Sequence, residues 1–179
     1  MRHSDGYSRL QIVLHWTIAA LIVIQLTVNA DMQEAFAQRL ATGALPPNSG
    51  ATFHMVIGIT VLALALLRLV IRFGRGVPEA PEDNSPLVNL LSHATHLLLY
   101  GFMVLMPLTG ALAWFLGIEF SATLHELGRL VLIPAIFLHV AGVVVEELVL
   151  RNPILRRMLH PEGQEMGTPA RPGRFPNTR

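Results

Sequence analysis

The sequence predicts an all-α membrane protein built as a bundle of four transmembrane helices. Hydrophobic residues make up 52% of the 179 residues and charged residues only 14%, whereas soluble domains carry roughly 25% charged residues. Four long apolar runs follow one another, and each is long enough to cross a hydrocarbon core about 30 Å thick. With their short connections they fill residues 1–160, which we predict to form one membrane domain.

Other compositional features exclude several classes of function. The net charge of +1 provides no general basic surface for nucleic acid. The chain contains no Cys, which excludes disulfides, thiolate zinc sites and cysteine-attached cofactors. Residues 161–179 are rich in Gly, Pro and Arg, and we predict that they form a disordered cytoplasmic tail.

The first predicted span covers residues 10–28. A cleaved signal peptide is the alternative, because Arg2 and Arg9 precede the apolar run and small residues follow it. However, the run is longer than the roughly 7 to 15 residues of a signal core. It also contains His15, Gln25 and Thr27. We therefore interpret it as a transmembrane helix.

Three further spans are predicted at residues 53–73, 87–116 and 123–150. Segments rich in Pro and Gly at 45–50 and 74–86 mark the loops before the second and third spans. Pro107 with Gly110 in the third span, and Pro134 in the fourth, predict kinks. Membrane helices tolerate such kinks because neighbouring groups satisfy the freed carbonyls.

The distribution of Arg residues predicts the orientation. Most lie in three regions that would share one face of the membrane: the N-terminal tail, the loop between the second and third spans, and the segment after the fourth. They are Arg2 and Arg9, Arg72 and Arg75, and Arg151, Arg156 and Arg157. The first loop has only Arg39. The positive-inside rule therefore places both termini in the cytoplasm.

Four His residues fall at two matched depths. His15 lies about 7 Å into the first span at about 1.5 Å per residue, and His139 on the fourth span shares this inner depth. His54 and His125 share the outer depth. His125 and His139 are fourteen residues apart, which is about 21 Å and about four turns, so both project from one helix face. The bundle is thus expected to hold two facing pairs of imidazoles.

These pairs predict two non-covalent b-type haems, each held by two His residues. An ionisable side chain inside a membrane is costly and indicates a functional site, and neutral imidazole is a good axial ligand for haem iron. Two alternatives stay open. The imidazoles could bond only to neighbouring backbone or hydroxyl groups, or they could form the site of a divalent-metal transporter, although the first two spans offer no carboxylate between their ends.

Two Arg residues are candidates for binding haem propionates. Arg68 lies fourteen residues after His54 and so reaches the inner layer on the same helix face, where its guanidinium suits a carboxylate. Alternatively, it extends to the cytoplasmic surface together with Arg72. Arg129 lies one turn after the outer His of the fourth span, and it would bind the outer propionates or pair with Glu126.

A His-x-x-His motif, formed by His93 and His96, lies at the cytoplasmic end of the third span with Tyr100 one turn further on. No facing His is left for this motif. We therefore expect hydrogen bonds from it to a propionate or a quinone carbonyl, with two interfacial polar residues as the alternative. Glu146 lies seven residues after His139 and is a candidate for moving protons to a quinone.

Several motifs occur in order along the chain. They are Tyr7-Ser8-Arg9-Leu10-Gln11-Ile12-Val13-Leu14-His15-Trp16, His54 followed by Gly58 and Arg68, His93-x-x-His96-x-x-x-Tyr100, Pro107-Leu108-Thr109-Gly110, Leu124-His125-Glu126, Leu138-His139-Val140 and Leu155-Arg156-Arg157-Met158. Together they resemble the prokaryotic cytochrome b561 family over roughly residues 7–160. The chain is also similar to the wider group of di-haem b subunits of hydrogenases and formate dehydrogenases.

The resemblance implies two b haems, ligated by His15 with His139 and by His54 with His125. It also implies a quinone such as ubiquinone as electron partner, and a bacterial inner membrane. Some family members are thought to oxidise superoxide at the outer face and to pass the electrons to ubiquinone. Two features depart from the family pattern: the outer loop at 117–121 is short, and Glu146-Glu147 stands where a His pair is expected.

The function expected from these features is that of a di-haem b-type cytochrome, which transfers electrons between a quinone and a partner at the opposite membrane face. One alternative is a superoxide oxidase, for which Arg39 and Arg129 are the only basic residues expected near the outer His pair. A second is a membrane-anchor cytochrome b subunit that docks a soluble dehydrogenase, and a third is a haem-free divalent-metal transporter. Quinone and membrane lipid are the expected partners, with a redox protein or superoxide at the outer face.

Overall fold

The computed structural model describes residues 6–28, 31–44, 49–78, 80–81 and 84–161, and their secondary structure is helical. In chain order the elements are α1 (Arg9–Thr27), α2 (Met32–Thr42), α3 (Ser49–Arg75), α4 (Pro86–Leu116), α5 (Glu119–Val144), the π-helical turn η1 (Val145–Val149) and α6 (Ile154–Arg157). Four helices, namely α1, α3, α4 and α5 continued by η1, are long and apolar enough to cross a membrane. The predicted four-helix transmembrane bundle is confirmed.

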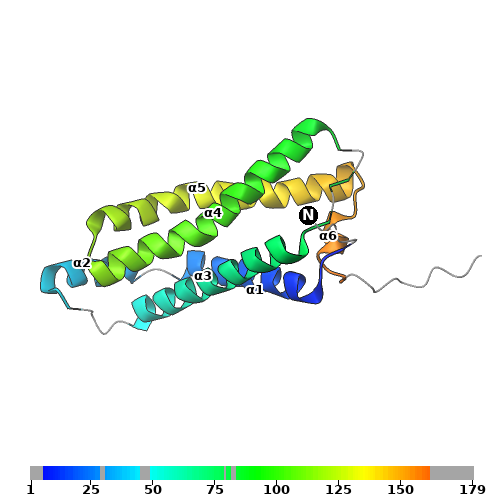
Figure 1. Ribbon diagram of the computed structural model, residues 1–179. Coiled ribbons are helices and arrows are strands. Elements are labelled where there is room, and N and C mark those ends of the chain that lie inside the picture. The colour runs from blue at the N-terminus through cyan, green and yellow to red at the C-terminus, as the bar shows by residue number, and fades with distance from the viewer. Residues whose placement is uncertain (1–5, 29–30, 45–48, 79, 82–83, 162–179) are drawn as a thin grey trace, which may run out of the picture.

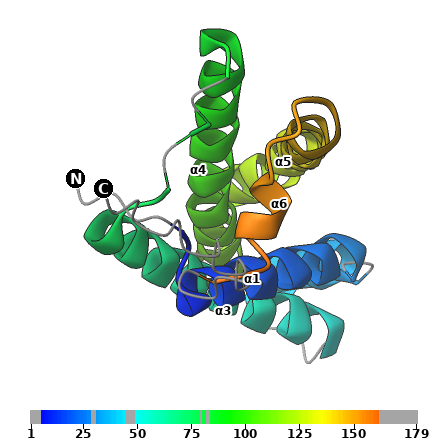
Figure 2. The ribbon, with the colours of Figure 1, turned by 90° about the vertical axis from the view of Figure 1, so that its right-hand side faces the viewer.

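The helices pack in a chain of neighbours. α1 lies along α3, α4 packs against both α3 and α5, and the contact between α4 and α5 is the most extensive. Figures 1 and 2 show α1 and α3 side by side, with α5 on the other side of the bundle and α4 between the two groups. Within the described part of the chain, α5 has no comparable backbone contact with α1 or α3.

Local sequence signals set the helix ends. The side chains of Ser8 and Gln11 form a reciprocal capping box at the start of α1, and Ser85 caps α4 just before Pro86. Gly117 ends α4 in the left-handed conformation, with φ of 69°, which glycine adopts without steric cost. α5 begins two residues later at Glu119. The fourth span therefore starts four residues earlier than predicted, and the outer loop is shorter still.

Both intrahelical prolines lie within continuous helices, Pro107 in α4 and Pro134 in α5. The tail predicted at residues 161–179 lies outside the described residues, apart from Pro161. Its disorder and the domain boundary at residue 160 remain predictions.

One short helix was not predicted. α2 follows the first span and packs through Ala35 on Ala51 and Trp114 at the end of the bundle. Arg39 stabilises the C-terminal ends of two helices here, because its guanidinium donates to the carbonyl oxygens of Gly43 and Phe115. Eleven residues of mixed polarity give little signal in the sequence, so this helix depends on tertiary contacts.

The end of the last span widens into the π-helical turn η1, which was also not predicted. The two oxygens of Glu146 accept amide hydrogen bonds from Asn84 and Asn152, both at 2.7 Å. Glu147 accepts from the backbone nitrogen of Leu155 at 3.0 Å. Glu146 therefore ties the end of the span to the segment before α4 and to the segment leading into α6.

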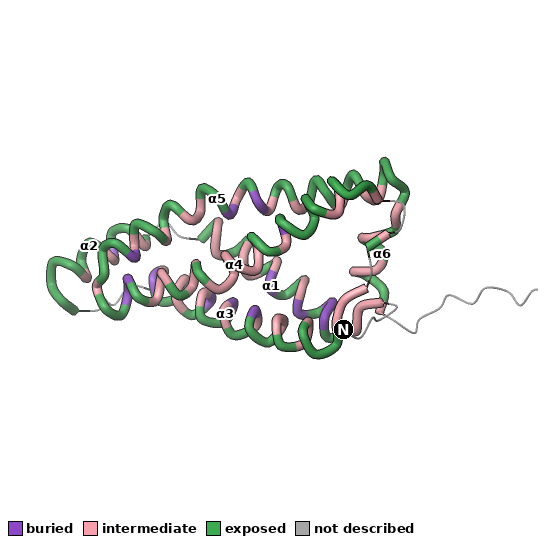
Figure 3. Tube along the Cα trace, turned by 45° about the horizontal axis from the view of Figure 1, so that its top comes forward, coloured by how far each residue is buried: buried purple, intermediate pink, exposed green. Residues whose placement is uncertain are grey.

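The side chains facing outward are largely apolar, as expected for helices surrounded by lipid. A small core formed by Ile18, Ile57 and Val61 joins α1 to α3. Figure 3 shows that buried positions are few and that exposed stretches dominate the helices. Exposed examples include Val70, Leu97 and Phe137. Lipid contact, in place of a thick protein core, accounts for this pattern.

Candidate functional site

Two pairs of imidazole rings meet between helices that are distant in sequence. The ring centres of His15 on α1 and His139 on α5 lie 6.2 Å apart, with an interplanar angle of 66°. Those of His54 on α3 and His125 on α5 lie 6.1 Å apart, with an angle of 76°. The structure thus brings together the rings that were predicted to share each depth.

These separations fit two imidazoles on opposite sides of one metal ion. An imidazole nitrogen lies about 1.15 Å from its ring centre, and a metal–imidazole bond measures about 2.0 to 2.1 Å. Two rings that bind one ion from opposite sides therefore have their centres about 6.3 to 6.5 Å apart, within a few tenths of an ångström of both observed values. The interplanar angle is free in such an arrangement, since both rings can turn about their shared axis.

Both pairs bridge helices whose backbones do not otherwise pack closely, because α5 contacts mainly α4. A planar macrocycle needs such a separation between the helices that supply its axial ligands. The chemistry of the donors and their separation therefore fit a bis-His b-type haem at each depth.

The ring of His125 is held in a fixed orientation. Its Nδ1 donates to the carbonyl oxygen of Met106 at 2.7 Å, which leaves Nε2 free. A Cβ added at Gly110 would lie 3.0 to 3.1 Å from the His125 ring. Ser121 donates to the Thr109 carbonyl at 2.9 Å and fastens the start of α5 to α4 beside the ring. Gly110 and these bonds set where the His125 ring lies.

Gln25 supports the outer pair in a way the sequence did not reveal. Its Nε2 donates to the carbonyl oxygen of His54 at 2.8 Å and so links α1 to α3. A Cβ at Gly58 would lie 3.2 Å from that nitrogen, so the glycine makes room for the amide. The available signal was a polar residue inside an apolar span, since a buried amide requires a partner.

The inner pair has two aromatic neighbours. The ring centre of His96 lies 5.0 Å from that of His139, with the planes at 86°, and Trp16 lies 5.3 Å from His15. Trp16 also donates from Nε1 to the Met158 carbonyl at 2.9 Å, which holds the segment after α6 against α1. The inner layer therefore contains three imidazoles where two were expected.

The two His residues of the His-x-x-His motif differ in their surroundings. Each bonds through Nδ1 to a carbonyl one turn earlier, His93 to Asn89 at 2.6 Å and His96 to Ser92 at 2.7 Å. Among the described rings, His96 meets His139, and no ring contact involves His93. The structure thus separates two residues that the sequence treated alike.

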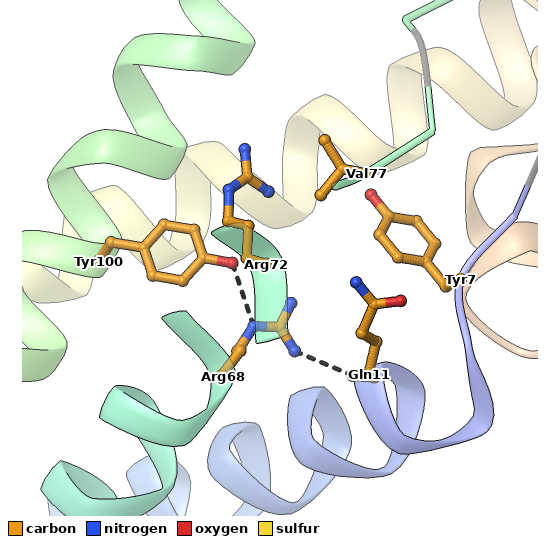
Figure 4. A pocket seen from close by; sticks show the side chains of 6 residues that line it. All are labelled: Tyr7, Gln11, Arg68, Arg72, Val77 and Tyr100. Carbon is orange, nitrogen blue, oxygen red and sulfur yellow. Dashed lines mark hydrogen bonds between the residues drawn. The ribbon is translucent and has the colours of Figure 1, made fainter. Parts of the chain in front are cut away.

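A polar pocket lies beside the inner layer, and Figure 4 shows the side chains that line it. Arg68 donates from Nε to the Tyr100 hydroxyl and from Nη1 to the Gln11 carbonyl, both at 3.2 Å. Arg72 lies with its guanidinium carbon 5.3 Å from the Tyr100 ring centre. Arg68 is therefore hydrogen-bonded to both α1 and α4.

Arg129 lies near enough to His125 for its charge to act on that ring. The alternative pairing with Glu126 is not found among the described residues, where Glu126 accepts from Gln33 at 3.2 Å. Arg39 is held by two helix ends, as described above. Of the two basic residues expected near the outer pair, Arg129 acts on the His125 ring, and Arg39 bonds to the C-terminal ends of α2 and α4.

The metal-transporter alternative receives no support from side-chain clusters. Within the described ranges, no group of three or more His, Cys, Asp or Glu side chains is arranged to hold a bare metal ion. The imidazoles instead occur as the separated pairs described above.

The chain is similar to known membrane cytochromes. The family model of prokaryotic cytochrome b561 matches residues 6–161. The chain is 32% identical to cytochrome b562 of Cereibacter sphaeroides over 164 residues, which cover 90% of this chain and 99% of that protein. It is 27% identical over 104 residues, 58% of this chain and 55% of the relative, to a probable superoxide oxidase, CybB, of Yersinia pestis. The chain therefore belongs to the prokaryotic cytochrome b561 family, whose members are membrane cytochromes with b-type haem.

Proposed function

We propose that this protein is a di-haem cytochrome of the bacterial inner membrane, which carries electrons between a quinone and a partner at the opposite membrane face. The single observation that carries the proposal is the occurrence of two imidazole pairs, each with the ring separation of a bis-His metal site. His15 and His139 would hold one haem, and His54 and His125 the other. When bound, the haems supply one-electron redox chemistry.

The separation of the pairs along α5 supports transfer across the membrane. Fourteen residues separate His125 from His139, which is about 21 Å along a helix. An electron that moves between the two heights crosses much of the hydrocarbon core. Its transfer is therefore coupled to the membrane potential by up to roughly 2.3 kcal/mol per 100 mV for a full crossing.

Polar side chains at the inner end would serve the inner haem and the quinone. Arg68 would donate to a propionate, since a guanidinium with two hydrogen bonds to its surroundings still has three N–H donors. Nε2 of His93 and of His96 would donate to a propionate or a quinone carbonyl when the ring carries a proton on both nitrogens, because each Nδ1 already bonds to a backbone carbonyl. Glu146 would take part in proton movement to the quinone, although both its oxygens already accept amide hydrogen bonds.

A superoxide oxidase is the second candidate, because one relative carries that name at 27% identity. Such an activity calls for a positively charged approach to the outer haem. Arg129 would provide one charge there or bind the outer propionates, whereas Arg39 bonds to two helix ends. A redox protein is the alternative partner at that face. A docked soluble dehydrogenase is the third possibility, and its co-purification would reveal it.

Absorption spectroscopy of the purified protein tests the proposal. Dithionite-reduced minus oxidised spectra, with haem measured per polypeptide, are expected to show two b haems for each chain. Addition of a quinol in place of dithionite is expected to reduce them. A folded protein that stays colourless after expression with ample haem supply would contradict the proposal and favour a haem-free function. Haem reduction by superoxide, but not by quinol, would favour the second candidate.

The orientation, with both termini and the segment between α3 and α4 in the cytoplasm, is part of this proposal. It rests on the Arg distribution and the positive-inside rule. Fusion of a reporter that is active only in the cytoplasm to Arg179 would test it.

A further inference from the structure

The pocket at one end of the bundle contains two positive charges and no carboxylate among its lining residues. These are Tyr7, Gln11, Arg68, Arg72, Val77 and Tyr100. They come from the start of α1, the end of α3, the segment just after it, and α4. Figure 4 shows Arg68 and Arg72 between the two tyrosines. A site with this lining favours an anion.

Arg72 has more unused N–H donors than Arg68. Among the described residues it contacts the face of the Tyr100 ring and makes no side-chain hydrogen bond. Arg68, by contrast, is fixed by Tyr100 and by the Gln11 carbonyl. The planar guanidinium of Arg72 therefore remains available to bind a phosphate through two parallel N–H groups.

Hydrogen bonds hold one wall of the pocket in place. Gln11 is 5% exposed, and its side chain accepts from the Ser8 nitrogen and donates to the Gly76 carbonyl at 3.1 Å. These bonds fix the wall between α1 and the end of α3. The Tyr7 hydroxyl lies outside the membrane-spanning helix, and burial raises its pKa, so it remains a hydrogen-bond donor at neutral pH. Figure 4 shows the Arg72 side chain between those of Tyr100 and Tyr7.

The pocket lies where two candidate membrane spans end, since Tyr7 lies two residues before the first span and Val77 two residues after the second. This position corresponds to the interface with the lipid headgroups. Tyrosines are enriched at this interface, and basic pockets between transmembrane helices bind anionic lipid headgroups. We propose that this pocket binds the phosphate of an anionic phospholipid, with Arg72 as its main ligand. Inorganic phosphate and a haem propionate share this oxyanion chemistry. The experiment below distinguishes each of them from a bound lipid.

The test uses the purified, delipidated full-length protein with its haem. Native mass spectrometry would measure binding of phosphatidylglycerol and of phosphatidylcholine with the same acyl chains, and thermal unfolding would measure protection by inorganic phosphate. The variants are Arg72→Gln and Arg9→Gln. Arg9 is the matched control, because it lies at the same membrane end, is exposed, and does not line the pocket.

We expect one phosphatidylglycerol to be retained in preference to phosphatidylcholine by the wild type and by Arg9→Gln. Arg72→Gln is expected to weaken it by about tenfold or more, with haem content unchanged. Equal binding by Arg72→Gln and wild type, equal retention of the two lipids, or protection by inorganic phosphate without lipid binding would overturn the proposal. Loss of haem in Arg72→Gln would instead assign the pocket to a propionate. If the wild-type protein binds no haem, only the proposed function is contradicted. Lipid binding by the wild type and the variants can still be compared.

Discussion

The imidazole of His96 meets that of His139 edge to face, with ring centres 5.0 Å apart and planes at 86°. This distance is shorter than the roughly 6.3 to 6.5 Å of two rings that bind one ion from opposite sides. His96 therefore stands beside the proposed ligand as a neighbour, and its Nδ1 bond to Ser92 holds it there. Such a contact restricts the rotation of the His139 ring.

We predict that His96→Ala shifts the midpoint potential of one haem by roughly tens of millivolts and changes its electron paramagnetic resonance signal, because an unrestrained axial ring reorients. His96→Phe, which keeps an aromatic edge, is expected to restore most of the wild-type signal. His160→Ala is the control, since His160 also bonds through Nδ1 to a carbonyl four residues earlier, and no ring contact among the described residues involves it. Loss of a haem in His96→Ala would show that His96 is a ligand and would contradict this prediction.

The number of haems bound per chain in double variants tests which two His residues ligate the same haem. His15→Ala and His139→Ala are each expected to lose one haem, and the double variant should lose no more, because both residues hold the same group. The cross-pair variant of His139→Ala with His125→Ala should lose both. Pyridine haemochrome assays per polypeptide measure this. Additive losses within a pair would contradict the pairing.

Gly110→Val is predicted to disturb the outer haem site. Even the Cβ of the new side chain would lie 3.0 to 3.1 Å from the His125 ring, and such overpacking costs about 1 to 3 kcal/mol. We expect lower occupancy of one haem and a lower midpoint of thermal unfolding. Gly74→Val is the control, because a Cβ there meets nothing within 4 Å. Equal effects of the two changes would refute the steric explanation.

Glu146→Gln is predicted to destabilise the protein by about 1 to 3 kcal/mol. The amides of Asn84 and Asn152 donate to different oxygens of Glu146, and the new NH₂ group would face one of these donors. Glu147→Gln is expected to be nearly neutral, since the retained amide oxygen can still accept from Leu155. Denaturant unfolding in mild detergent compares the two, and indistinguishable stabilities would contradict the prediction.

The hydroxyl of Tyr7 is predicted to ionise above its ordinary pKa of 10.0, because burial outweighs the nearby charge of Arg72. The chain has two tyrosines, so a Tyr100→Phe variant with ¹³C-labelled tyrosine reports Tyr7 alone by NMR. Since the pKa of Tyr7 is raised in the folded state, the contribution of its neutral hydroxyl to the free energy of unfolding is fully present below pH 10. This contribution is lost as the pH rises through the folded pKa. Titration at or below pH 10 would contradict burial of this hydroxyl.

The four spans could be predicted because apolar runs of this length have few alternatives. The grouping of His15 with His139, and of His54 with His125, by depth required only the helical rise. Their ligation of haem stays a prediction. The contact of His96 with His139 could not be predicted, since it depends on how far α4 is rotated against α5.

Other features depended on contacts that are distant in sequence. Arg39 was predicted as part of the outer approach, but it bonds to the ends of α2 and α4. The π-helical turn moved the residues after Val144 away from regular helical positions. A regular helical rise per residue therefore predicted the depths of the proposed His ligands. It did not predict the direction of the Glu146 side chain, which lies in the π-helical turn.

α5 contributes one ring to each pair, and among the described residues it is the last of the four candidate spanning helices. During synthesis, the His15–His139 pair is incomplete until His139 has emerged from the ribosome. Until then the nascent chain offers at most one complete pair. Under the proposed ligation, insertion of the bundle precedes full loading with iron porphyrin, and truncated products remain incompletely loaded.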